Sequence, residues 1–323
     1  MATFYWLDDN PERSTAAENL NAVLDSEVVF WNLQKTVLEK ELSDLVNKAE
    51  PALVILDHNL EDADRGVFKK GSTAAAFVRD AWPECPIICV TGEDVHHLNS
   101  QQKALYEEVI PISKISDHYD SIRSIADSFS ELRKKRPANS DELLKLLYTP
   151  EIDIERLSSV LPTGLKEDFA DNGLLVEISR WLRGTLLERP GFLYNKLWIS
   201  TLLGVKEDSF SKIDHLFEKA KYQGIFSSSD KPRWWKSIAL EILADHVDMS
   251  GLPWEKGRQL PGVDEVDFSS CYVSEEPFPE TVAFTDQSQN PTEAPMKMKY
   301  TILHPDFERL VYFDDIRLMK PAE

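Results

Sequence analysis

The sequence predicts an α/β fold: a doubly wound, five-stranded parallel sheet, followed by a mostly α-helical domain and a C-terminal extended or β segment. Three observations lead to this prediction. Five short apolar runs alternate with helix-like stretches up to residue 136. Helical periodicity without such runs dominates residues 137–248, and residues 249–323 contain few periodic apolar positions. We therefore expect a domain at 1–136, a helical output domain at 137–248 and an acidic arm with C-terminal strands at 249–323.

The elements of the first domain follow from apolar spacing and from local start and stop signals. Asn10-Pro11 is typical of a helix start, because proline is favoured at the first helical position. Residues 53–57 form a continuous apolar run, as expected for a strand covered on both faces. The predicted strands are 3–8, 27–33, 53–57, 87–91 and 109–113, and the predicted helices are 11–24, 36–48, 71–82, 100–108 and 118–132.

The remaining chain is predicted from helical spacing and from a change of composition. The expected helices are 140–147, 154–160, 172–187, 193–203, 209–222 and 234–246. Residues 249–295 are rich in proline, acids, Ser and Thr, which indicates an extended arm. Two short strands are expected at 298–303 and 310–318.

Composition excludes several classes of function. The net charge of −20 argues against a nucleic-acid or membrane-surface binder. Only three cysteines are present, without zinc-ligand spacing, which fits a reducing, cytoplasmic setting. No leader peptide is evident, and no apolar run approaches the ~20 residues of a membrane helix. We therefore expect a cytoplasmic protein that contacts neither nucleic acid nor membrane.

Polar residues follow the predicted strands where each one ends. Asp8 and Asp9 close the first strand, Asp57 the third, Thr91 the fourth and Lys114 the fifth. The carboxyl ends of parallel strands meet at one edge of the sheet, where ligands bind in such folds. Three carboxylates, a hydroxyl and an ammonium at one edge can hold a divalent cation and a phosphoryl group.

Four motifs resemble those of a bacterial response-regulator receiver domain, over about two-fifths of the chain. They are Trp6-Leu7-Asp8-Asp9-Asn10-Pro11, Val54-Ile55-Leu56-Asp57-His58-Asn59-Leu60, Pro86-Ile87-Ile88-Cys89-Val90-Thr91-Gly92 and Ser113-Lys114. All four stand at strand ends in the family's order. Residues 137–323 resemble no family that we recognise.

The resemblance implies a receiver (flavodoxin-like) fold and a role for each site residue. Asp57 would accept the phosphoryl group, and Mg²⁺ would be held by Asp8, Asp9, Asp57 and the carbonyl of Asn59. Lys114 would pair with a phosphoryl oxygen, and the Thr91 hydroxyl would move toward it on phosphorylation. The chain would be a two-component or phosphorelay response regulator that takes its phosphoryl group from a histidine kinase or phosphotransfer protein.

The sequence departs from the family in three places. The loop at 58–70 is lengthened, Pro111 stands near the place of a switch aromatic, and Ile115 replaces the usual proline. Tyr106 is a candidate spatial substitute for the switch aromatic. These departures affect the output switch and leave the phosphoryl chemistry intact.

The output is expected to be a protein contact with an unknown effector. Residues 137–323 contain no phosphate loop and no nucleophile and base in a known order, so the sequence predicts no enzyme beyond the reactions of Asp57 itself. One alternative is a receiver-like adaptor that is never phosphorylated. Another is a DNA-binding regulator, which the slightly acidic balance of 137–248 disfavours.

Individual residues also have simpler interpretations. Asp8 and Asp9 could cap the following helix, Thr91 could be an ordinary strand-end hydroxyl, and Lys114 could be a solvated surface lysine. The adjacent His96 and His97 do not favour metal binding. The basic and aromatic run at 231–236 suits a nucleic acid, a protein contact or a helix start with a buried tryptophan.

Overall fold

The computed structural model describes 3–24, 26–34, 50–60, 69–92, 98–227, 231–248, 250–271, 273–275, 281–282, 296–303, 305 and 318–319 of the 323 residues. The predicted helix at 36–48 lies outside these residues, as do His96, His97 and most of the loop 58–70. The chain divides into two compact units. One contains 1–138 together with 168–180, and the other contains 139–167 together with 181–323.

The first unit contains the predicted five-stranded parallel sheet. Its strands are β1 (Thr3–Asp8), β2 (Glu27–Asn32), β3 (Leu53–Asp57), β4 (Ile87–Thr91) and β5 (Glu108–Pro111). They pair in the order β2-β1-β3-β4-β5, and every pairing is parallel. This is the order of the doubly wound flavodoxin-like fold, so the predicted fold class is confirmed.

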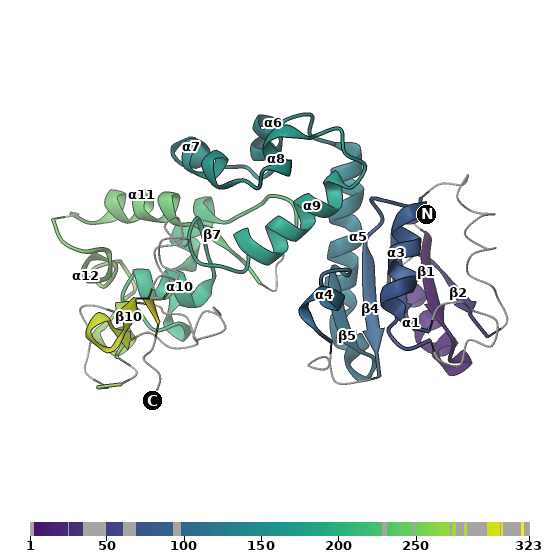
Figure 1. Cartoon of the computed structure of the whole chain (residues 1–323). Coiled ribbons are helices and arrows are strands. Elements are labelled where there is room, and N and C mark those ends of the chain that lie inside the picture. The colour runs from purple at the N-terminus through teal and green to yellow at the C-terminus, as the bar shows by residue number, and fades with distance from the viewer. Residues whose placement is uncertain are drawn as a thin grey trace. The chain divides into compact units, whose positions relative to one another are not determined.

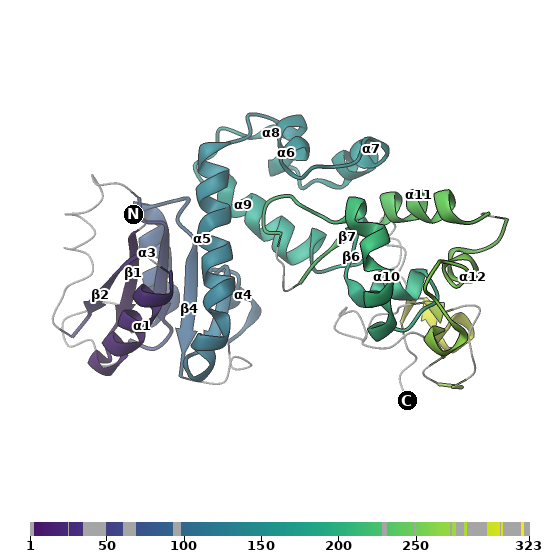
Figure 2. The same ribbon diagram turned by 180° about the vertical axis from the view of Figure 1, so that it is seen from behind.

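Helices cover both faces of this sheet. They are α1 (Ser14–Leu24), α3 (Gly71–Ala81), α4 (Ser100–Lys103) and α5 (Tyr119–Lys134). The helices α1 and α5 contact each other, and Figures 1 and 2 show them on the face opposite α3. All five residues of β3 and of β4 are buried. The central strands therefore carry an apolar core on both sides, as their continuous apolar sequences predict.

Two boundaries differ from the prediction. The helix expected at 100–108 ends at Lys103, and Tyr106 beyond it is buried in the core cluster that contains Cys89 of β4. The strand β5 ends at Pro111, and a 3₁₀ turn at Ile112–His118 follows. Lys114 therefore lies in this turn rather than at the last position of a strand.

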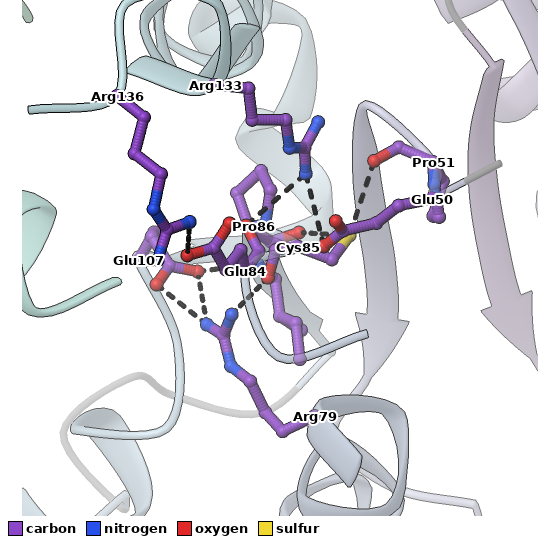
Figure 3. A network of polar contacts seen from close by, with 10 residues as sticks. Glu50, Pro51, Arg79, Glu84, Cys85, Pro86, Glu107, Arg133 and Arg136 are labelled. Atoms are coloured by element: carbon purple, nitrogen blue, oxygen red, sulfur yellow. Dashed lines mark hydrogen bonds and ion pairs between the residues drawn. The ribbon is translucent and has the colours of Figure 1, made fainter. Parts of the chain in front are cut away.

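A polar network ties the amino-terminal edge of the sheet together (Figure 3). Arg79 of α3 donates to both carboxylate oxygens of Glu107, at 2.7 and 2.9 Å, and the Glu107 side chain is fully buried. Arg136, just after α5, pairs with Glu84 and donates to the carbonyl oxygen of Asp171 at 2.8 Å. The last contact joins the segment 168–180 to the first unit.

The second unit is mostly helical, as predicted. Its helices are α6 (Ser140–Leu146), α7 (Glu151–Val160), α8 (Gly164–Glu167), α10 (Lys196–Leu202), α11 (Lys236–His246) and α12 (Pro253–Gly257). The helix α9 (Leu174–Trp181) lies almost wholly in the first unit and continues as a π-helical turn at Leu182–Leu186 in the second. The predicted helix at 172–187 is therefore divided between the two units.

Short strands and 3₁₀ turns replace parts of the predicted helices. The strand β6 (Leu193–Tyr194) pairs with β7 (Trp234–Trp235), just before α10 and α11 begin. Residues 209–222 form two 3₁₀ segments, Asp208–Lys212 and Asp214–Ala220. Their buried residues Phe210, Ile213, Phe217 and Ala220 recur every three or four positions, a spacing that 3₁₀ and α-helices share.

The chain beyond α11 contains more folded structure than the expected arm. Residues 250–271 include α12 and a 3₁₀ turn at Glu265–Asp267. Short antiparallel pairs join β8 (Thr281–Val282) to β9 (Met296–Lys297) and β10 (Ile302–Leu303) to β11 (Leu318–Met319). A 3₁₀ turn occupies Met298–Tyr300, and the predicted strand at 310–318 falls almost entirely outside the described residues. Among the described helices, none is long and apolar enough to cross a membrane.

Candidate functional site

The carboxyl-terminal edge of the sheet brings together three predicted carboxylates. Asp8 ends β1 and Asp57 ends β3, and these strands are hydrogen-bonded neighbours whose last pair is Leu7 with Leu56. Asp8, Asp9 and Asp57 are 0%, 5% and 3% exposed. One carboxylate oxygen from each lies within 4.8 Å of the others. The parallel register thus gathers side chains separated by almost fifty positions.

Thr91 lies at the same edge. It ends β4, the other neighbour of β3, and Asp57 pairs with Val90 in that register. Thr91 is 1% exposed. The predicted hydroxyl is therefore one strand away from the predicted phosphoryl acceptor.

Arg13 contacts the acidic cluster, and the sequence analysis missed it. Its Nη1 atom donates to Asp57 Oδ1 at 2.8 Å and to Asp8 Oδ2 at 3.0 Å. The side chain of Asn10 accepts from the backbone of Glu12, and the Arg13 amide donates to the Asn10 carbonyl. These bonds form the 3₁₀ turn at Pro11–Arg13. The sequence signal that could have indicated this contact is a basic residue within two turns of the paired aspartates Asp8 and Asp9.

Two further donors fix the Asp8 carboxylate. The Trp6 indole Nε1 donates to Asp8 Oδ2 at 3.3 Å, and the Asn10 amide donates to Asp8 Oδ1 at 2.8 Å. Both oxygens of Asp8 are therefore held in place before any ligand arrives. Trp6 itself is fully buried, so its position is set by the core.

The three carboxylates of the site carry more negative charge than the Arg13 cation beside them can neutralise. Burial raises the pKa of Asp57 to about 7, and the negative charge of Asp8 adds to that rise while Arg13 opposes it. Burial likewise raises the pKa of Asp8, against the effect of its hydrogen bonds and of Arg13. Carboxylates that are hard to ionise together are stabilised by an added cation. The donor set, three carboxylates with oxygen atoms only, fits Mg²⁺.

Asn59 lies two residues beyond Asp57, at the base of the lengthened loop. It forms an isolated antiparallel bridge with Lys70, and the Leu60 amide donates to the Lys69 carbonyl. The Gly71 amide donates to the His58 carbonyl at 2.7 Å. These bonds close the loop beside the site and fix the backbone whose carbonyl is predicted to bind the metal.

Lys114 is not part of the assembled cluster. It is exposed in the 3₁₀ turn after β5, and no ion pair joins it to the three aspartates in the described part of the chain. Its contact with a phosphoryl oxygen stays a prediction. Tyr106 is 5% exposed and packs in the core cluster that contains Cys89.

The second unit contains a separate pocket of about 440 Å³ between α7 and α11. Its walls are largely apolar, with Phe192 at one side and Arg156 stacked 5.6 Å from that ring. The buried Asp153 accepts a hydrogen bond from Ser237 at its edge. No sequence motif pointed to this pocket.

Comparison with known proteins gives similarity at the level of structure. No family model and no curated protein matches the chain. A receiver-domain protein of Methanospirillum hungatei has 14% identity over 41% of this chain and 98% of its own, with a TM-score of 0.32. The response regulator TrrA of Thermotoga maritima, solved in complex with Mg²⁺ and BeF, has 18% identity over 39% and 99%, with a TM-score of 0.31. The receiver domain of NtrX from Brucella abortus has 15% identity over 38% and 96%, with a TM-score of 0.32.

Strand order and pairing establish the fold of the first unit independently. A five-stranded parallel sheet in the order β2-β1-β3-β4-β5 is the receiver arrangement, and acids end its first and third strands. The predicted receiver-like fold is therefore confirmed.

Proposed function

We propose that the chain is a two-component or phosphorelay response regulator in which Asp57 accepts a phosphoryl group. The observation that carries this proposal is the buried cluster of Asp8, Asp9 and Asp57 at the functional edge of the sheet. Asp8, Asp9, Asp57 and the Asn59 carbonyl would hold Mg²⁺, which would draw negative charge from the transferring phosphoryl group.

The protein's own groups position and activate the acceptor. Asp57 is held at a strand end with its oxygens buried, so its orientation is set before the donor arrives. A new bond forms between an Asp57 oxygen and phosphorus while the donor's bond to phosphorus breaks. Thr91, at the end of the neighbouring strand, would donate a hydrogen bond to a phosphoryl oxygen. Lys114 would supply a cation if its turn moved toward the edge.

The partners follow from this chemistry. The donor would be a phosphohistidine on a kinase or phosphotransfer protein, because a carboxylate acceptor needs a reactive phosphoryl donor. The helical second unit would bind an effector protein in the output step. The setting would be a bacterial cytoplasm, and the chain would catalyse no reaction beyond those at Asp57.

The test is phosphoryl uptake from acetyl phosphate, followed by the intact mass of the protein. Wild type with Mg²⁺ should gain one phosphoryl group, and EDTA should prevent the gain. Asp57→Asn should gain none, whereas Asp120→Asn, a change at an exposed aspartate of the same unit, should behave as wild type. Uptake by Asp57→Asn would refute the assignment of the acceptor.

A second function is favoured by one specific observation. Arg13 already bonds to Asp8 and Asp57, so the acidic cluster is partly neutralised without any ion. This suits a receiver-like adaptor that binds partner proteins without phosphorylation. Wild type that takes up no phosphoryl group from acetyl phosphate or from a phosphorylated phosphotransfer protein, and binds no Mg²⁺, would support the adaptor.

A further inference from the structure

One nitrogen atom of Arg13 joins two carboxylates of the site. Nη1 lies 2.8 Å from Asp57 Oδ1 and 3.0 Å from Asp8 Oδ2, so it stands between the two acids. The side chains of Asp8 and Asp57 are 0% and 5% exposed, and that of Arg13 is 16% exposed. The guanidinium therefore covers the two oxygens from the solvent side of a buried pair.

We propose that Arg13 is an internal cation that competes with the divalent ion for Asp8 and Asp57. The guanidinium must leave these two oxygens before the ion can bind them. This inference rests on the proposed function, since it concerns the same metal site. It adds a residue that sets the affinity and the timing of metal loading.

Competition follows from space and charge. A magnesium ion needs its oxygen ligands at about 2.0–2.1 Å. An ion between the same two oxygens would overlap the present position of Nη1. The two cations would also repel each other strongly in a buried site, where the effective dielectric constant is low. The Arg13 guanidinium and the magnesium ion therefore cannot occupy the gap between Asp8 and Asp57 at the same time.

Arg13 has to move, because it cannot be neutralised. A guanidinium keeps its proton in proteins, so it cannot yield by losing charge. The residue ends the short turn at Pro11–Arg13, and its side chain already reaches solvent. Its Nη2 atom lies 3.5 Å from the position that a Cβ on Gly92 would occupy. The side chain thus spans the edge from β1 to the end of β4, and its departure would open the place where a phosphoryl group would meet Thr91.

The experiment is a titration of the full chain with Mn²⁺, with free Mn²⁺ measured by its electron paramagnetic resonance signal. Mn²⁺ takes the same oxygen ligands as Mg²⁺ and is directly visible. Arg13→Ala and Arg13→Gln should each bind Mn²⁺ about tenfold more tightly than wild type, which corresponds to about 1.4 kcal/mol. Glutamine keeps a hydrogen-bond donor near the acids, so it serves if the alanine variant does not fold.

Arg123→Ala is the matched control. Arg123 is an exposed arginine of the same unit, in α5, and its guanidinium donates to the Val23 carbonyl rather than to the acids. If Arg123→Ala gained as much affinity for Mn²⁺ as the Arg13 variants, the gain would come from the loss of one positive charge anywhere in the unit, and the inference would be overturned. Unchanged or weaker binding in both Arg13 variants would also overturn it while leaving the metal site in place. If neither wild type nor any variant binds Mn²⁺, the inference and the metal-dependent function fail together.

Discussion

Gly71 lies directly against the carbonyl group of Asp57. A Cβ built on Gly71 would overlap the Asp57 carbonyl oxygen and stand 2.9 Å from the Cα atom of His58. The Gly71 amide also donates to the His58 carbonyl. The first residue of α3 therefore packs on the backbone of the strand end that carries Asp57, and only glycine leaves room for that approach.

Gly71→Ala is expected to lower the free energy of unfolding by about 1–3 kcal/mol, because the added methyl group would push α3 away from the end of β3. Phosphoryl uptake at Asp57 should slow as the acceptor shifts. The measurements are urea unfolding and the uptake rate. The control is Gly184→Ala, where a Cβ would meet no atom within 4 Å other than those of its chain neighbours and its own helical turn. An equal loss of stability in both variants would contradict the packing argument.

Glu107→Gln is expected to destabilise the protein by about 3–5 kcal/mol. The change leaves the positive charge of the largely buried Arg79 guanidinium without a negative partner. Removing one member of a buried ion pair is strongly destabilising, because the remaining charge is not compensated. Urea unfolding measures the effect. Glu131→Gln removes the exposed pair with Lys135 and should cost about 0.5 kcal/mol. Similar losses in the two variants would show that burial does not determine the cost.

The positions of Asp8, Asp57 and Thr91 could be predicted because each follows a short apolar strand. Parallel strands bring their carboxyl ends to one edge, so strand order and local sequence suffice to gather these residues. The same reasoning placed Lys114 directly after the last residue of a strand. The strand before it ends at Pro111 instead, and Lys114 lies in the 3₁₀ segment that follows.

Arg13 could not be assigned from its spacing alone. Its role depends on a side-chain conformation that reaches both Asp8 and Asp57, which no periodicity encodes. The division of the chain into its two compact units could not be predicted for a similar reason. Residues 168–180 join the first unit through long-range contacts, such as that of Arg136 with the Asp171 carbonyl. The local spacing of apolar residues does not predict contacts of this kind.

Arg136→Ala is expected to loosen the segment 168–180. The arginine donates to the Asp171 carbonyl and pairs with Glu84, so its loss removes a direct hydrogen bond between the chain just after α5 and the segment. Amide hydrogen exchange at 168–180 should become faster. Lys134→Ala, a change at an exposed neighbour in α5, should leave the exchange as in wild type. Unchanged exchange in Arg136→Ala would show that other contacts hold the segment.

Asp267 is expected to make the stability of the second unit sensitive to acid. Its carboxylate accepts from Lys212 Nζ at 2.7 and 2.8 Å, from Ser209 Oγ at 2.8 Å and from the Asp264 amide at 3.0 Å. The hydrogen bond from Lys212 and the two other donors lower the pKa of Asp267 to about 2. The ionised form is therefore favoured in the folded state relative to the unfolded chain.

The sign of the pH effect follows from this lowered pKa. The stabilising contribution of Asp267 is fully present above the pKa of an unfolded aspartate, about 3.9. It is lost as the pH falls from there toward 2, where the folded carboxylate takes up its proton. Wild type should therefore exceed Asp267→Asn in stability at pH 5 to 7, and the difference should shrink between pH 4 and 2. Urea unfolding at each pH measures it. Asparagine keeps the shape of the side chain but does not titrate, and its amide nitrogen cannot accept the hydrogen bonds that one of the two carboxylate oxygens receives. A difference that stays constant across this range would therefore show that protonation of Asp267 contributes nothing to the pH dependence.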